Sequence, residues 1–182
     1  MAEDLRPMLS ALLPRLRRFG LALTGSAVEA DELVQDACAR ALQREAQLRD
    51  HNRLDAWLYG IMRHLWIDEI RARRHRRHDS LDAAAEVAGD DGPAVAEGRI
   101  TLALVRRRLQ EMPADQRAVL ILVCVDGLSY REAAEVLGVA IGTVMSRLSR
   151  ARRDLADRLG GRPGGSVSVF PGPNGRTPLR SM

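Results

Sequence analysis

The sequence predicts an all-α protein of two small helical domains joined by a flexible acidic linker. Apolar residues recur at helical spacing in several segments, as in amphipathic helices. Aromatic residues make up only 3% of the chain, so we expect a core of mostly Leu, Ala and Val, which suits packed helices better than a β-sandwich. Residues 79–98 contain six carboxylates and no basic residue, and they separate two arginine-rich segments. A chain of 182 residues has room for two such domains.

The charge of the chain points to a polyanionic partner. The net charge is +4, and all 28 basic residues are arginines. A GC-rich genome would explain most of the arginine bias, so the positions of the arginines are informative and their frequency is not. Cys38 and Cys124 lie far apart, which predicts reduced thiols and no disulfide framework. No signal peptide and no stretch of about 18 apolar residues is visible, so we expect a cytoplasmic protein without membrane insertion.

The first domain, residues 1–78, begins with two expected helices over 5–23 and about 27–45. Ser26 and Glu29 have the spacing of a capping box at the start of the second helix. Leu33, Val34 and Ala37 form part of its inner face. Its outer face is polar and rich in carboxylates, and it is either simply solvated or able to dock on a basic protein surface: Asp31, Glu32, Gln35, Asp36 and Arg40.

A long helix is expected from Asp55 or Ala56 to the end of this domain, after a polar connector at 48–55. His64 and Asp68 share one of its faces. Its end carries more arginines than the helix dipole accounts for, which indicates a phosphate-contacting patch: Arg71, Arg73, Arg74, Arg76 and Arg77. The histidines near this helix lack a fourth ligand at suitable spacing, so no metal site is expected.

The second domain, residues 99–160, is predicted to contain a helix-turn-helix at 127–153. A helix over 99–112 comes first. The apolar segment 114–125 follows, and its β-branched residues also permit a strand, although its surroundings favour a buried helix. Ser129 and Glu132 fit a capping box, and Gly138 stands where a helix would end in a left-handed residue.

The helix expected from Ile141 or Gly142 has two different faces. Its inner positions are apolar: Val144, Leu148, Ala151 and Leu155. Its outer positions are polar or basic: Thr143, Ser146, Arg147, Arg150 and Arg153. This pattern is typical of a recognition helix in the major groove, and the alternative is an ordinary hairpin with a solvated basic face. Residues 161–182 are rich in Gly and Pro and predict a disordered tail.

Taken together, these segments resemble the extracytoplasmic-function (ECF) group of sigma-70 family sigma factors. DELVQDACARAL at 31–42 is similar to the helix of region 2 that binds RNA polymerase. AWLYGIMRHLWIDEIRARRHR at 56–76 is similar to the part of region 2 that melts and reads the −10 element. MPADQR at 112–117 and GLSYREAAEVLGVAIGTVMSRLSRAR at 127–152 are similar to region 4, whose helix-turn-helix reads the −35 element.

The resemblance implies a role for each surface. Core RNA polymerase would bind Asp31, Glu32, Gln35, Asp36 and Arg40. The −10 element would contact His64, Asp68, Arg71, Arg73, Arg74, Arg76 and Arg77. The −35 element would contact Thr143, Met145, Ser146, Arg147, Ser149, Arg150, Arg152 and Arg153. It further implies promoter DNA as a ligand, an anti-sigma factor as regulator, and no catalytic residue, metal or cofactor.

Three residues depart from the family pattern. His64 stands where Asn is frequent, in the region that holds an unstacked −10 base. Met145 replaces a frequent Lys or Arg on the recognition helix, and Ala140 replaces a frequent Pro in the turn. We expect His64 to keep a hydrogen-bonding role with an altered base preference, and Met145 to lose a charged contact.

Other functions account for less of the sequence. A stand-alone helix-turn-helix regulator explains residues 127–153 but not the second basic helix or the acidic linker. A helical adaptor that binds only proteins does not explain the arginines at 71–77. An enzyme is the least expected, because no nucleophile–base pair, phosphate loop or metal spacing is present.

Overall fold

The structure, a computed structural model, describes residues 5–48, 50–79 and 107–158. All regular elements within these residues are helical, as the sequence predicted. They include α1 (Leu5–Thr24), α2 (Ala27–Gln43), α3 (Leu54–Asp79), α5 (Ala114–Leu120), α6 (Tyr130–Leu137) and α7 (Ile141–Arg158), with short helices at Glu45–Gln47, His51–Arg53 and Ile121–Val125. Residues 107–110 are helical as well, and the earlier part of the helix predicted over 99–112 lies outside the described residues. The predicted tail at 161–182, and the predicted linker beyond its first residue, lie outside the described residues.

Helices α1, α2 and α3 pack around a core of large apolar side chains. Phe19 and Tyr59 are fully buried, and their rings meet edge to face with centroids 4.9 Å apart. Gly20 lets α1 approach α2 closely, because a Cβ there would lie 3.2 Å from the carbonyl oxygen of Ala30. Pro14 lies inside α1 without ending it.

The predicted capping boxes formed to different extents. At the start of α6, Ser129 Oγ accepts from the Glu132 amide, and the Glu132 carboxylate accepts from the Ser129 amide at 2.9 Å, so this box is confirmed. At the start of α2, Ser26 Oγ accepts from the Glu29 amide, but the Glu29 carboxylate pairs instead with Arg73 at 2.9 Å. The prediction of a complete box there was therefore wrong, since a nearby guanidinium competes for the carboxylate.

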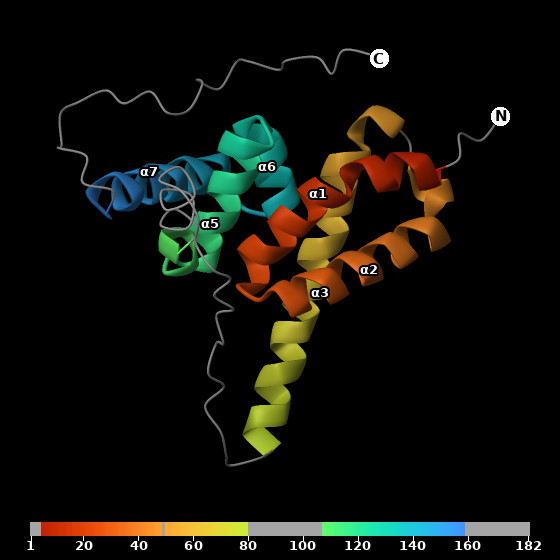
Figure 1. Cartoon of the computed structure of the whole chain (residues 1–182), viewed down its shortest axis with the longest axis horizontal. Helices are drawn as coiled ribbons and strands as arrows, with labels where there is room; N and C mark the ends of the chain where they lie inside the picture. The colour runs from red at the N-terminus through yellow and green to blue at the C-terminus, as the bar shows by residue number, and fades with distance from the viewer. Residues whose placement is uncertain (1–4, 49, 80–106, 159–182) are drawn as a thin grey trace, which may run out of the picture.

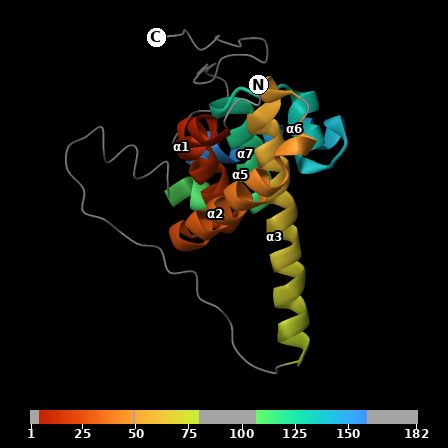
Figure 2. The ribbon, with the colours of Figure 1, turned by 90° about the vertical axis from the view of Figure 1, so that its right-hand side faces the viewer.

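The second half of α3 projects away from the rest of the described chain, as two perpendicular views show (Figures 1 and 2). Its first half is buried, with Leu58, Tyr59 and Met62 fully covered. Beyond Glu69 its side chains are partly buried or exposed as far as Arg76. The arginines of the predicted phosphate-contacting patch therefore belong to the projecting half of α3.

The apolar segment 114–125 is helical and not a strand. α5 continues into a wider π-helical turn at Ile121–Val125, which the amide of Asp126 closes by donating to the Ile121 carbonyl at 2.9 Å. Val119, Leu120 and Leu122 are buried. Side chains of α5 and α6 share one apolar cluster with α1, α2 and α3. The C-terminal helices thus pack directly on the N-terminal ones, an arrangement that the sequence pattern did not predict.

Candidate nucleic-acid interface

Helices α6 and α7 form the predicted helix-turn-helix. Gly138 ends α6 with φ +56° and ψ +42°, the left-handed conformation that glycine adopts without strain. Its amide and that of Val139 donate to carbonyls of the last turn of α6. The four predicted inner positions of α7 are buried and fix its rotation: Val144, Leu148, Ala151 and Leu155.

The predicted −35 residues fall into two groups on α7. Those on its outer face are exposed: Met145, Ser146, Ser149, Arg150 and Arg153. The other group is partly buried: Thr143, Arg147 and Arg152. Arg147 Nη2 lies 2.6 Å from a carboxylate oxygen of Asp115, and Arg152 Nη2 lies 3.4 Å from Cys124 Sγ. The outer face therefore presents two exposed arginines, Arg150 and Arg153, beyond exposed polar and apolar side chains of the preceding turns.

The predicted −10 residues on α3 include arginines with partners in the protein. Glu69 accepts from Arg73 Nε at 2.8 Å and from Arg76 Nη2 at 2.9 Å. These guanidinium groups hold the pKa of the Glu69 carboxyl below its usual range. The Arg73 guanidinium also lies over the ring of Trp66, 5.5 Å from its centroid.

The rest of the −10 set is open to solvent where it is described. Arg71 Nη1 lies 3.7 Å from Asp68, and both side chains are largely exposed. Arg74 is exposed, and the side chain of Arg77 lies outside the described residues. In this patch Arg73 is therefore held by contacts within the protein, while Arg71 and Arg74 are accessible.

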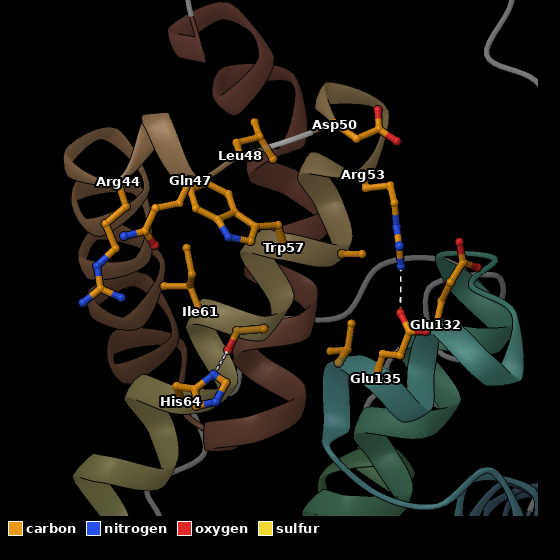
Figure 3. Close-up of a pocket in the computed structure, with 13 residues that line it drawn as sticks. Arg44, Gln47, Leu48, Asp50, Arg53, Trp57, Ile61, His64, Glu132 and Glu135 are labelled. Atoms are coloured by element: carbon orange, nitrogen blue, oxygen red, sulfur yellow. Dashed lines mark hydrogen bonds and ion pairs between the residues drawn. The ribbon is translucent and has the colours of Figure 1, made fainter.

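His64 lies at one end of a cavity of about 530 Å³ that the polar connector also lines (Figure 3). Its Nδ1 lies 2.6 Å from the carbonyl oxygen of Gly60, which only an N–H can satisfy, so the neutral ring leaves Nε2 as an acceptor. Gly60 lies in mid-helix, and a Cβ there would meet nothing within 4 Å. The cavity thus brings His64 close to residues of the connector, including Asp50 and Arg53.

The opposite wall of this cavity belongs to α6. Glu132 and Glu135 face the side chains of the connector and α3 across it, and Arg53 Nη2 donates to Glu135 at 2.8 Å (Figure 3). The Glu135 carboxylate raises the pKa of the Arg53 guanidinium. Two carboxylates from the second half of the chain therefore line the cavity beside His64.

The predicted polymerase-binding face on α2 is accessible. Glu32, Gln35 and Asp36 are exposed, and Arg40 is partly buried. Asp31 accepts from Arg17 Nε and Nη2, both at 2.7 Å, and these hydrogen bonds lower the pKa of its carboxyl. Asp31 is thus bound to Arg17 of α1, while Gln35 and Asp36 in the next turn of α2 are exposed to solvent.

Sequence reasoning missed the residues that join the two halves of the chain. Asp126 lies next to the helix-turn-helix, and its side chain has 0% exposure. Its carboxylate accepts from Tyr59 and Arg18. Arg117 is buried in α5 and donates through Nε to the carbonyl of Ala22 at 2.6 Å. The signals available were an arginine inside an apolar run and a tyrosine on the apolar stripe of α3.

Comparison with known proteins identifies both halves. Residues 8–76 match the family described as Sigma-70 region 2, and residues 102–155 match Sigma-70, region 4. The ECF RNA polymerase sigma factor EcfG of Rhodopseudomonas palustris is 36% identical over 156 residues, which cover 86% of this chain and 85% of that protein. The chain belongs to the ECF sigma factors of the sigma-70 family. A stand-alone regulator is not better supported, because the region 2 match has no place in it.

Solved structures agree with this assignment. The sigma factor RpoE from Bartonella quintana, in complex with the anti-sigma factor NepR, matches with a TM-score of 0.75 and 34% identity over 86% of this sigma factor and 97% of that chain. CnrH, in complex with the cytosolic domain of CnrY, matches with a TM-score of 0.57 and 25% identity over 85% and 86%. The fold and the function of this chain are those of an ECF sigma factor, a transcription initiation factor. None of its described helices has the length and apolar character needed to cross a bilayer.

Proposed function

We propose that this sigma factor reads promoters at two points, with residues 1–78 at the −10 element and residues 99–160 at the −35 element. One observation supports the proposal: exposed arginines lie on two separate elements of the chain, α7 and the projecting half of α3. A simple helix-turn-helix regulator needs only the first. Two such surfaces on one chain suit the two elements of a promoter, while other parts of the chain bind RNA polymerase.

At the −35 element, α7 would enter the major groove with its first turns. Ser146, Ser149 and Arg150 are exposed on the face that would meet base edges. Arg153 lies one turn further, where a phosphate contact is expected. Arg147 contributes by holding α7 to Asp115, at the start of α5, and so sets the angle of the recognition helix.

At the −10 element, the cavity beside His64 would receive an unstacked base. The absence of a side chain at Gly60 leaves space there, and the His64 Nε2 acceptor suits a base edge that carries an amino group. Arg71 and Arg74 on the projecting half of α3 would contact the backbone of the same strand. In its neutral form His64 would therefore take the place of the frequent Asn, with Nε2 as a hydrogen-bond acceptor and Nδ1 bound to the Gly60 carbonyl.

The packed arrangement is a closed form that has to open on the promoter. Elements centred about 25 base pairs apart lie roughly 85 Å apart along the duplex. The two regions instead share one apolar cluster, and α6 places Glu132 and Glu135 at the −10 cavity. These carboxylates would repel a DNA strand, so we infer that region 4 moves away from α3 before the cavity is used.

The partners follow from the same surfaces. Glu32, Gln35 and Asp36 on α2 offer core RNA polymerase a carboxylate-rich face. RpoE and CnrH were each solved with a further protein, an anti-sigma factor in the case of RpoE, and we propose an anti-sigma factor for this chain as well. The protein would act in the cytoplasm with the polymerase, and no residue in it would catalyse a reaction.

In vitro transcription with core RNA polymerase, over a promoter library randomised at both elements, tests this function. We expect transcripts that depend on the sigma factor and that share one −10 and one −35 sequence. A library in which only one element is enriched would contradict two-point reading. Binding of library duplexes without any polymerase-dependent transcript would favour the stand-alone regulator.

A further inference from the structure

Two apolar side chains stand in solvent on the first turns of α7. Ile141 is 46% exposed and Met145 is 53% exposed, and they lie four residues apart on one side of the helix. The buried stripe of α7 is complete without them, since Val144 and Leu148 already fill the core. The packing of the described protein therefore does not explain an apolar pair at this place.

The exposed neighbours of the pair on α7 are mainly polar. Ser146, Ser149 and Arg150 are exposed on the adjoining side of α7, and Gly142 is exposed in its first turn, next to Ile141. A Cβ at Gly142 would meet nothing within 4 Å, so packing does not require glycine there. Glycine is unfavourable inside a helix, so a glycine at this position is best explained by a bound partner that approaches the backbone of α7 closely.

We propose that Ile141 and Met145 recognise the C5-methyl groups of thymines in the −35 element. Thymine is the one base that presents an apolar group in the major groove, and an apolar side chain contacts that methyl favourably. The first turns of a recognition helix are those that reach base edges. The inference rests on the proposed reading of the −35 element by α7 and names a chemical group that it reads.

Duplex DNA suits this surface better than another protein does. An apolar protein partner would bury Arg150 and the serines beside the pair without their hydrogen bonds, at a cost. In the major groove the same polar side chains meet donors and acceptors of base edges, while Arg153 lies within reach of the backbone. The flexible thioether of Met145 adapts to a methyl group whose position varies with the bend of the duplex.

The test uses full-length sigma factor with core polymerase and a duplex promoter selected from the randomised library. Each thymine of the −35 element, on either strand, is replaced singly by deoxyuridine, which removes only the methyl. We expect at least one replacement to weaken binding about fourfold, the effect of one buried methyl. Met145→Gln and Ile141→Thr should bind the thymine promoter more weakly and should no longer distinguish uracil from thymine at the contacted position.

Val28→Gln is the matched control, because Val28 is 69% exposed on α2, outside the proposed DNA surface, and its variant should keep the full thymine preference. Equal binding of all deoxyuridine promoters by the wild type would overturn the inference, as would a selected −35 element without an A·T pair. The inference would also be wrong if the Met145→Gln variant kept the thymine preference and differed from the wild type only in that a protein partner no longer inhibited its transcription. If the binding of the wild-type holoenzyme did not depend on the −35 sequence at all, the proposed function itself would be refuted.

Discussion

The hydroxyl of Tyr59 in α3 donates a 2.8 Å hydrogen bond to Oδ2 of Asp126, at the end of the π-helical turn that precedes the helix-turn-helix. Arg18 Nη2 donates to Oδ1 of the same carboxylate at 2.9 Å, and Arg15 Nη2 donates to the Asp126 backbone carbonyl at 3.1 Å. The carboxylate is fully covered. One aspartate thus links two helices of region 2 to region 4, and its contacts must break when the regions separate.

Asp126→Asn should loosen the closed form without disturbing either region. The amide keeps the shape and one acceptor but loses the charge opposite two arginines, a loss of about 2 kcal/mol for hydrogen bonds to a charged group. We expect a lower urea midpoint, faster trypsin cleavage and tighter binding to core polymerase. Asp157→Asn changes an exposed carboxylate near the end of α7, away from the predicted polymerase-binding face, and is the control that should leave cleavage and core binding unchanged. Unchanged cleavage and unchanged core affinity in Asp126→Asn would contradict the role of this aspartate.

The stability of the closed form should fall at alkaline pH because of Tyr59. Burial, and then the Asp126 charge, raises the pKa of the Tyr59 hydroxyl well above its ordinary range. The unfolded chain releases this proton near pH 10 while the folded chain keeps it, so the free energy of unfolding decreases as pH rises above about 10. Urea titrations from about pH 8 to pH 11 should show a steeper decline in the wild type than in Tyr59→Phe. Parallel curves would show that the hydroxyl does not contribute in this way.

Arg117 should be essential for stability although it lies in an apolar helix. Its guanidinium donates to the Ala22 carbonyl of α1 and to three carbonyls before α5, and burial lowers its pKa. Arg117→Met leaves these acceptors without their donor, which should cost roughly 3 kcal/mol in the free energy of unfolding. Arg131→Met changes an exposed arginine of α6 and should cost less than about 0.5 kcal/mol. Similar losses in the two variants would contradict the structural role of Arg117.

The arginines of α7 should differ in their effect on the salt dependence of promoter binding. Arg153 is exposed, so Arg153→Ala should reduce the slope of log affinity against log salt by about one. Arg147 is neutralised by Asp115 at 2.6 Å, so Arg147→Ala should leave the slope almost unchanged. Holoenzyme binding to one promoter over a range of salt concentrations measures both. A larger change for Arg147→Ala than for Arg153→Ala would reverse the assignment.

Local patterns were enough to predict the helices and the helix-turn-helix. The apolar spacing of Val144 and Leu148 set the rotation of α7, and the Ser129 cap and Gly138 set the ends of α6, because these features depend on residues three or four positions apart. The strand alternative for 114–125 failed because tertiary packing overrides a weak β preference. Glu29 left its predicted capping box for Arg73, a partner 44 residues away that local spacing does not reveal.

The contact between the regions had no local signature. Tyr59 reads as one more apolar position of α3, and Asp126 reads as a turn residue before Gly127. Their meeting depends on the rigid placement of α5 against α1, which also brings Arg117 to the end of α1. The same placement brings Glu135 to the cavity beside His64. A pattern along the chain can therefore predict candidate DNA-binding surfaces, but it cannot predict how the two regions pack against each other.

The distance between region 2 and region 4 can be measured with spin labels at Val28→Cys in α2 and Arg131→Cys in α6, in a chain with Cys38→Ala and Cys124→Ala. Both label sites are exposed, and the native cysteines are only partly so. We predict one narrow distance distribution in the free protein, set by the packed regions, and a distance longer by tens of ångströms in the holoenzyme on a promoter, as elements roughly 85 Å apart require. The distance of the free protein, kept in a holoenzyme that transcribes, would contradict the opening of the Tyr59–Asp126 contact.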